Sequence, residues 1–247
     1  MNIEEFALGD SLIHRLDPRV KIVVAAFYSV IVALNGSLQA TAASICFPVV
    51  LVTVARLSVK RIFARMAVVN LFVLFLWLFL PLTGPGEIVY SFGPLDIYRE
   101  GLVHALLITL KSNAILLTVI ALLGTAPVFS LVHALSHMGA PDKLVHLFFF
   151  CYRYVHVVHG EYHRLANALK IRGFRPRTNM HTYRTYSYLV GMLLVRSFDR
   201  SARILSAMKC RGFTGRFHLM ERGEVNRKDY LVGASGILIS ALLLVVR

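Results

Sequence analysis

Apolar residues fall into five long runs, and this pattern predicts an all-α polytopic membrane protein. The runs cover residues 20–34, 38–57, 66–83, 101–125 and 231–246. A helix that crosses the hydrocarbon layer needs about 20 residues, with about 17 at the lower end of the range. The first and last runs are short by this measure, so flanking residues must complete them. We therefore expect about five transmembrane helices.

Local residues indicate where these helices begin and bend. Asp17 and Pro18 precede the first run, and aspartate caps helix starts while proline suits the first helical position. Asn35 and Gly36 are typical of a tight turn after that run. Pro48 falls inside the second run, where the missing N–H of proline predicts a kink.

Basic residues between the runs predict the orientation, because loops rich in Lys and Arg stay on the cytoplasmic side. Segment 56–65 carries four such residues, whereas segment 84–100 carries one. Arg15, Arg19 and Lys21 place the N-terminus in the cytoplasm. These charges predict a multi-pass protein of the inner (cytoplasmic) membrane, with its C-terminus outside.

Residues 126–230 hold 17 Lys and Arg against 6 Asp and Glu. Their patterning predicts helices over 129–138, 143–172 and 181–211, broken by Gly and Pro. We interpret this section as long cytoplasmic or interfacial helices and not as a separate globular domain. The chain then divides into four membrane helices in 1–125, the basic section in 126–230 and a last membrane helix in 231–247.

The net charge of +14 bears on the expected partners. A basic soluble chain suggests nucleic acid, but here the charges flank apolar segments and no RNA-binding or zinc-finger motif appears. We expect the basic residues to face the lipid bilayer or an acidic protein partner, and we expect no nucleic acid.

Two segments of the basic section match each other. Residues 164–174 resemble residues 203–213 at a constant offset of 39, with Arg, Ala, Lys, Arg, Gly and Phe identical at six positions. Each copy ends a predicted long helix. Gly173 and Gly212 suit the left-handed residue just past a helix C-terminus.

Each repeat also places a small residue beside an arginine at the helix end. Ala168 lies four residues before Arg172, and Ala207 lies four before Arg211, so each pair shares one helix face. Such an end can enter a groove and pair with a carboxylate through two hydrogen bonds. The alternative is an ordinary helix stop with a favourable cation in its last turn.

These motifs resemble the transmembrane T component of energy-coupling-factor transporters, and most closely the CbiQ-type subunit of cobalt and nickel uptake systems. That family carries two short motifs, usually Ala-Arg-Gly, at the ends of cytoplasmic coupling helices. The matching residues here are Ile171-Arg172-Gly173 and Cys210-Arg211-Gly212, which depart from Ala at the first position. The segment from His14 to Lys21 is also similar to the family's sequence before its first span.

The resemblance implies a non-catalytic subunit for ATP-driven uptake, with cobalt as the first candidate cargo and nickel or a vitamin as alternatives. It implies two ABC-type ATPase partners, each holding one helix end. It also implies a CbiM-like substrate-binding membrane subunit, with or without a small CbiN-like subunit. Ala168, Arg172, Gly173, Ala207, Arg211 and Gly212 would form the ATPase-coupling site.

The chain contains no phosphate-binding loop, since the dipeptide Gly-Lys never occurs. We therefore expect no cofactor in this chain, with ATP and Mg²⁺ bound by the partner ATPases. His156, His159 and His163 have helical spacing that can hold a metal, but we assign them no metal because such spacing alone is common on basic helices. Lys111 inside the fourth run is either functional or paired within the bundle.

Two other classes of function stay open from the residues alone. One is a polytopic membrane enzyme that uses the histidines at the cytoplasmic interface. The other is a stand-alone secondary carrier, which the absence of Asp and Glu from the five apolar runs disfavours.

Overall fold

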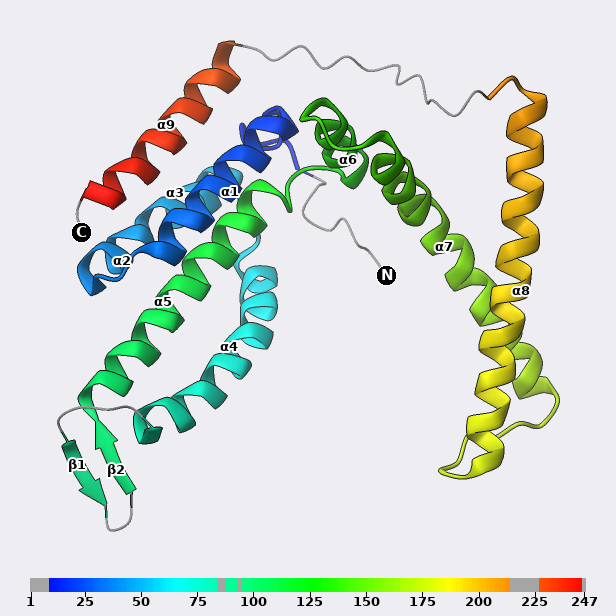
Figure 1. Ribbon diagram of the computed structural model, residues 1–247, viewed down its shortest axis with the longest axis horizontal. Coiled ribbons are helices and arrows are strands. Elements are labelled where there is room, and N and C mark those ends of the chain that lie inside the picture. The colour runs from blue at the N-terminus through cyan, green and yellow to red at the C-terminus, as the bar shows by residue number, and fades with distance from the viewer. Residues whose placement is uncertain (1–8, 84–87, 93–94, 214–226, 246–247) are drawn as a thin grey trace. The chain divides into compact units, whose positions relative to one another are not determined.

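The computed structural model describes residues 9–83, 88–92, 95–213 and 227–245 (Figure 1). The chain divides into two compact units. The first comprises Met1–Ala134 and Gly223–Arg247, and the second comprises Leu135–Arg222. The boundary falls within α6 (Val128–His137).

The first unit is a helical assembly in which α5 packs against α1, α3 and α4, while α9 packs against α1. Its helices are α1 (Pro18–Leu34), α2 (Leu38–Ser44), α3 (Cys46–Ala55), α4 (Val59–Thr83), α5 (Arg99–Leu122) and α9 (Arg227–Val245). Buried apolar side chains of α1, α3 and α5 form its core, including Val24, Ala25, Tyr28, Ala55, Ala114 and Leu122.

The second unit is built from two long helices in contact, α7 (Asp142–Ile171) and α8 (Met180–Cys210). Asn179 caps α8, and its side chain accepts a hydrogen bond from the Thr182 N–H at 2.9 Å. The described chain is therefore all-α in class. One small departure is an antiparallel hairpin of β1 (Ile88–Phe92) and β2 (Leu95–Tyr98), in a segment expected to be a loop.

Three segments of the described chain are long and apolar enough to cross a membrane. They are Leu38–Ala55, Val59–Pro81 and Arg99–Leu122, which correspond to the second, third and fourth predicted spans. Helix α1 has 17 residues, and the apolar part of α9 is the shorter Val232–Leu242. The protein is a polytopic membrane protein. That the first and last apolar runs also span the membrane stays a prediction. The predicted division of the chain into regions after residues 125 and 230 also stays a prediction.

The predicted kink in the second run is an interruption at one residue, Ile45, which keeps right-handed helical backbone angles and precedes Pro48. Helix α2 ends at Ser44 and α3 begins at Cys46. Because Pro48 has no N–H, it cannot donate to the Ser44 carbonyl one turn earlier. The fully buried Tyr28 of α1 supplies the missing donor, with its hydroxyl 2.6 Å from that carbonyl. A tertiary hydrogen bond therefore stabilises the break.

Lys21 differs from its expected role as a charge at the cytoplasmic surface. It is 1% exposed, and its Nζ donates to the His14 carbonyl and to the Thr125 hydroxyl, both at 3.4 Å. Asp17 and Asp229 attract it electrostatically. A charged amine can be buried when it is hydrogen-bonded and compensated in this way, so Lys21 belongs to the packed interior of the first unit.

Candidate functional site: two arginine-tipped helix ends

The first copy of the repeat ends α7 in a tight stop. Arg172 is the C-cap, and Gly173 has the left-handed backbone conformation with φ 80°. The Gly173 N–H donates to the Lys170 carbonyl at 3.0 Å, and the Phe174 N–H donates to the Leu169 carbonyl at 3.1 Å. This pair of bonds is a Schellman motif, which favours glycine at the left-handed position.

The second copy ends α8 with the same geometry. Arg211 is the C-cap, and Gly212 has φ 78°. The Gly212 N–H donates to the Lys209 carbonyl at 3.0 Å, and the Phe213 N–H donates to the Met208 carbonyl at 3.1 Å. The two C-caps also have similar backbone angles. Arg172 has φ −75° and ψ 8°, and Arg211 has φ −90° and ψ 12°. The predicted left-handed glycines are confirmed at both ends.

All six predicted site residues are at the surface of the second unit. The exposed set is Ala168, Arg172, Gly173, Ala207, Arg211 and Gly212. Among the residues that the structure describes, neither tip arginine makes an ion pair. Each helix end therefore presents a free guanidinium beside a small side chain. A role for these six residues in coupling to ATPases stays a prediction.

The phenylalanine of each copy lies at the junction of α7 and α8, a role that comparison of the two repeat copies did not assign. The Phe174 ring centroid lies 5.9 Å from that of Tyr186 and 6.2 Å from that of His181, both on α8. Phe213 lines a groove together with Phe150 of α7. The Arg172 tip is thus packed against α8 through an aromatic ring, whereas the ring at the Arg211 tip borders a cavity between the two helices.

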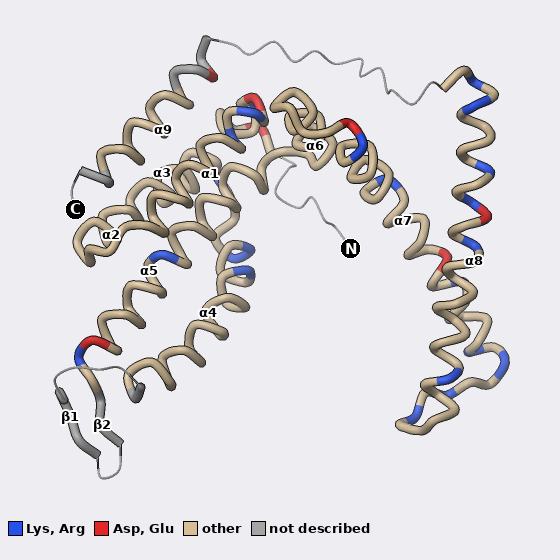
Figure 2. Tube along the Cα trace, viewed as in Figure 1, with Lys and Arg blue, Asp and Glu red and all other residues tan. Residues whose placement is uncertain are grey.

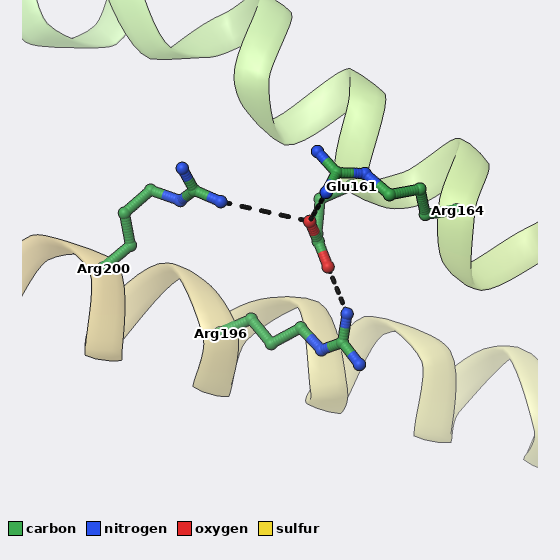
Figure 3. Close-up of polar contacts among 4 residues, drawn as sticks. All are labelled: Glu161, Arg164, Arg196 and Arg200. Carbon is green, nitrogen blue, oxygen red and sulfur yellow. Dashed lines mark hydrogen bonds and ion pairs between the residues drawn. The ribbon is translucent and has the colours of Figure 1, made fainter.

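A shielded carboxylate joins α7 to α8 (Figure 3), and the sequence patterns alone did not indicate it as a site. Glu161 of α7 is 8% exposed. One of its oxygens is paired with Arg196 of α8. The other lies 4.0 Å from Nη2 of Arg200 on α8 and 3.6 Å from Nη1 of Arg164 on α7. We call these four residues the Glu161 cluster.

The arginines keep the Glu161 carboxyl ionised. The hydrogen bond from Arg196 holds the pKa of this carboxyl below its usual range, and the charges of all three arginines act in the same direction against the effect of burial. A lowered pKa means that the ion pairs are complete above about pH 4.3, the ordinary glutamate value. They are lost only as the pH falls through the lowered value.

The residues discounted as ligands have structural partners. Nε2 of His159 and Nε2 of His163 are 2.9 Å apart, while Glu161 between them in sequence faces α8. Within the described ranges, no group of three or more His, Cys, Asp or Glu is placed to hold a metal ion. Lys111 donates to the Ala33 carbonyl at 2.9 Å and so links α5 to α1, which agrees with a lysine paired within the bundle.

The chain has two kinds of helices: apolar helices of membrane-spanning length, and a basic pair that ends in two matching arginine tips. This combination defines a class of polytopic α-helical membrane protein. Figure 2 shows that the long helices α7 and α8 carry charges along their length, whereas α1–α5 are largely free of them away from their ends. This division is expected of a protein with one part in lipid and another in contact with water or a partner.

The chain belongs to the CbiQ family, described as cobalt transport protein, whose pattern matches residues 9–221. The energy-coupling factor transporter transmembrane protein EcfT of Bacillus subtilis (strain 168) is 26% identical over 260 residues, covering 100% of this chain and 98% of the relative. The EcfT proteins of Leuconostoc gelidum subsp. gasicomitatum and Acidaminococcus fermentans are 27% and 25% identical, covering 85% and 94% of this chain and 83% and 92% of the relatives.

These matches confirm the resemblance seen in the arginine motifs. The chain is a T component of energy-coupling-factor transporters, a transmembrane subunit without catalytic activity of its own. The names of the relatives describe transporter subunits and so favour this class over a membrane enzyme.

Proposed function

We propose that this subunit transmits ATP-driven motion from two ABC-type ATPase subunits to a separate substrate-binding membrane subunit, and that the cargo is cobalt. The observation that carries the proposal is the pair of matching, exposed arginine tips at the ends of α7 and α8. Two equivalent ends fit a partner that comes in two like copies.

The chemistry of each tip favours an acidic groove. A guanidinium makes two parallel hydrogen bonds to a carboxylate, and a lysine cannot reproduce that geometry. The alanine on the same face leaves room for a groove wall to approach. A long helix behind each tip can carry a displacement without bending, because its backbone hydrogen bonds make it stiff along its axis.

The remaining assignments of the proposal follow from sequence patterns and from the names of relatives. ATP and Mg²⁺ are bound by the partner ATPases, since this sequence has no phosphate-binding loop. The protein lies in the inner membrane with its N-terminus in the cytoplasm. The family description supports cobalt as the cargo. With cobalt, the resemblance of the arginine motifs implies a CbiM-like substrate-binding subunit, with or without a small CbiN-like subunit.

The proposal is tested by replacing the tip arginines in the assembled transporter. Arg172→Ala and Arg211→Ala should each reduce co-purification of the ATPases, and the double variant should abolish ATP-dependent uptake of cobalt. Arg175→Ala is the matched control, because it removes an exposed arginine just outside the repeat and should leave both properties unchanged. Wild-type assembly and uptake in the double variant would contradict the proposal.

The same preparation tests the cargo and the carrier alternative. Uptake should be measured for cobalt, nickel and a vitamin, with and without ATP. A preference for nickel or a vitamin replaces cobalt as the cargo and leaves the coupling role intact. Uptake by this chain alone without ATP would instead support a secondary carrier.

A further inference from the structure

The offset that aligns the two tips also aligns the two sides of the Glu161 cluster. Glu161 and Arg200 are separated by 39 residues, as are Arg172 and Arg211. These two positions lie just before the two repeat copies, are related by the same offset and carry opposite charges. They meet in the structure, with Oε2 of Glu161 4.0 Å from Nη2 of Arg200 (Figure 3).

The cluster lies midway between the tips. Eleven residues separate Glu161 from Arg172 on α7, and eleven separate Arg200 from Arg211 on α8. At about 1.5 Å per residue, each arm is about 16 Å long. Helices α7 and α8 run in opposite directions (Figure 1), so the tips extend to opposite sides of the cluster.

Apolar packing between the helices is incomplete on the Arg211 side of the cluster. A cavity of about 350 Å³ separates residues of α7, such as Phe150 and Tyr154, from residues of α8, such as Ile204 and Met208. Beside this cavity, the ion pairs from Arg196 and Arg200 to Glu161 restrain the crossing of the two helices, while the Phe174 contacts restrain it on the opposite side.

We propose that Glu161 is a positioning residue: its ion pairs with Arg196 and Arg200 fix the point at which α7 and α8 cross and so set the spacing between the two arginine tips. The significance of that spacing for transport rests on the proposed function. The restraint itself is a property of this chain alone.

Removing the Glu161 carboxylate should change the angle and spacing at which α7 and α8 cross more than it changes the helical structure of either. In Glu161→Gln, three arginines converge without a counter-charge, and their repulsion favours separation of α7 from α8. The side chains of Arg164, Arg196 and Arg200 are 70%, 49% and 41% exposed, so the freed guanidinium groups can be hydrated. We expect the crossing to loosen while both helices stay folded.

The spacing between the two tips is measured by double electron–electron resonance between spin labels at equivalent positions of the two repeat copies. The native Cys210 and an introduced cysteine in Ile171→Cys are both exposed and ten residues beyond the cluster. Cys46→Ser and Cys151→Ser remove the other two cysteines. The purified chain in lipid nanodiscs should give one narrow distance distribution near or below about 30 Å, from two arms of about 15 Å.

Glu161→Gln should broaden this distribution and shift its maximum. Asp199→Asn is the matched control, because it removes an exposed carboxylate of α8 outside the cluster and should leave the distribution unchanged. The exchange variant Glu161→Arg with Arg196→Glu keeps one carboxylate among three guanidinium groups and should restore a narrow distribution. Circular dichroism of each variant checks that the helices are intact.

Two results would overturn the inference. One is an unchanged distribution in Glu161→Gln, and the other is an exchange variant as broad as the single variant. In the assembled transporter, Glu161→Gln should also lower the cobalt taken up per ATP hydrolysed while the ATPases still co-purify. Loss of ATPase binding only in the tip variants separates the proposed function from the positioning role, because the distance measurement needs no partner.

Discussion

At each tip, glycine provides the backbone turn and arginine provides the charge. Gly173 and Gly212 have positive φ, and an added Cβ at either would meet no atom within 4 Å. Conformation, not lack of space, therefore makes glycine the favoured residue at both positions. Arg172 and Arg211 lie where the helix dipole is negative, so a cation is also favoured there before any partner binds.

Gly173→Ala and Gly212→Ala should each loosen the helix end that they close. An L-residue in the left-handed region costs about 1 kcal/mol or more. The amides of Phe174 and Phe213, which close the two stops, should then exchange with solvent about fivefold faster or more, since 1.4 kcal/mol is a factor of ten.

Gly191→Ala is the control for this measurement. Gly191 lies inside α8 in open space without positive φ, so alanine there should leave the tips unchanged and favour the helix. Unchanged exchange at Phe174 in Gly173→Ala would show that the stop does not depend on the left-handed glycine.

At the scale of elements, the ends of the long helices could be predicted because local residues specify them. Helix α8 covers Met180–Cys210 against a predicted 181–211, and α7 covers Asp142–Ile171 against 143–172. Glycine stops, the Asn179 cap and continuous helical periodicity act within one turn of the chain. The two arginine tips were predictable for the same reason.

Features that depend on tertiary contacts could not be predicted in this way. The break before Pro48 depends on a hydroxyl of α1, and the burial of Lys21 depends on residues 104 positions or more away. The Glu161 cluster likewise joins residues 35 positions apart. The repeat offset is the single sequence signal that relates its two sides, because it connects position 161 with position 200.

The contact between α4 and α5 depends on a glycine, which yields a test of the packing. A Cβ added at Gly101 would lie 2.4 Å from the Leu80 carbonyl oxygen and 2.8 Å from Pro81 Cα, both backbone atoms. Gly101→Ala should therefore destabilise the first unit by about 1–3 kcal/mol, the usual cost of overpacking. Thermal unfolding in detergent should show a lower midpoint for this variant.

Gly36→Ala serves as its control, because a Cβ there meets no atom within 4 Å and the residue has no positive φ. Its unfolding midpoint should match that of the unchanged protein. Equal midpoints for Gly101→Ala and Gly36→Ala would mean that α4 and α5 do not approach as closely as described.

At the scale of the whole molecule, exposed apolar side chains occur in both units, whereas charged residues are concentrated in the second unit. Large side chains of α4 such as Leu71, Phe72 and Leu78 are more than 60% exposed, which suits contact with lipid. The second unit carries exposed basic residues along two helices (Figure 2). The proposed topology places this second unit in the cytoplasm.

Native cysteines test that topology. Cys151 and Cys210 are exposed and lie on α7 and α8. In a Cys46→Ser background, a membrane-impermeant maleimide should label them in inside-out vesicles and leave them unlabelled in right-side-out vesicles. A cysteine in Ser91→Cys, in the hairpin expected outside, should show the opposite pattern. Labelling of Cys210 from outside would contradict the proposed orientation.

Lys21 connects the folding of the first helix to that of the last. It lies near the start of α1, which leaves the ribosome early, whereas Asp229 belongs to α9, which is synthesised 208 residues later. Until α9 packs against α1, the ammonium lacks one of the two carboxylates that compensate it. A chain that ends before α9 would therefore bury Lys21 of α1 with one carboxylate fewer, so the packing of the first helix is complete only once the last has been made.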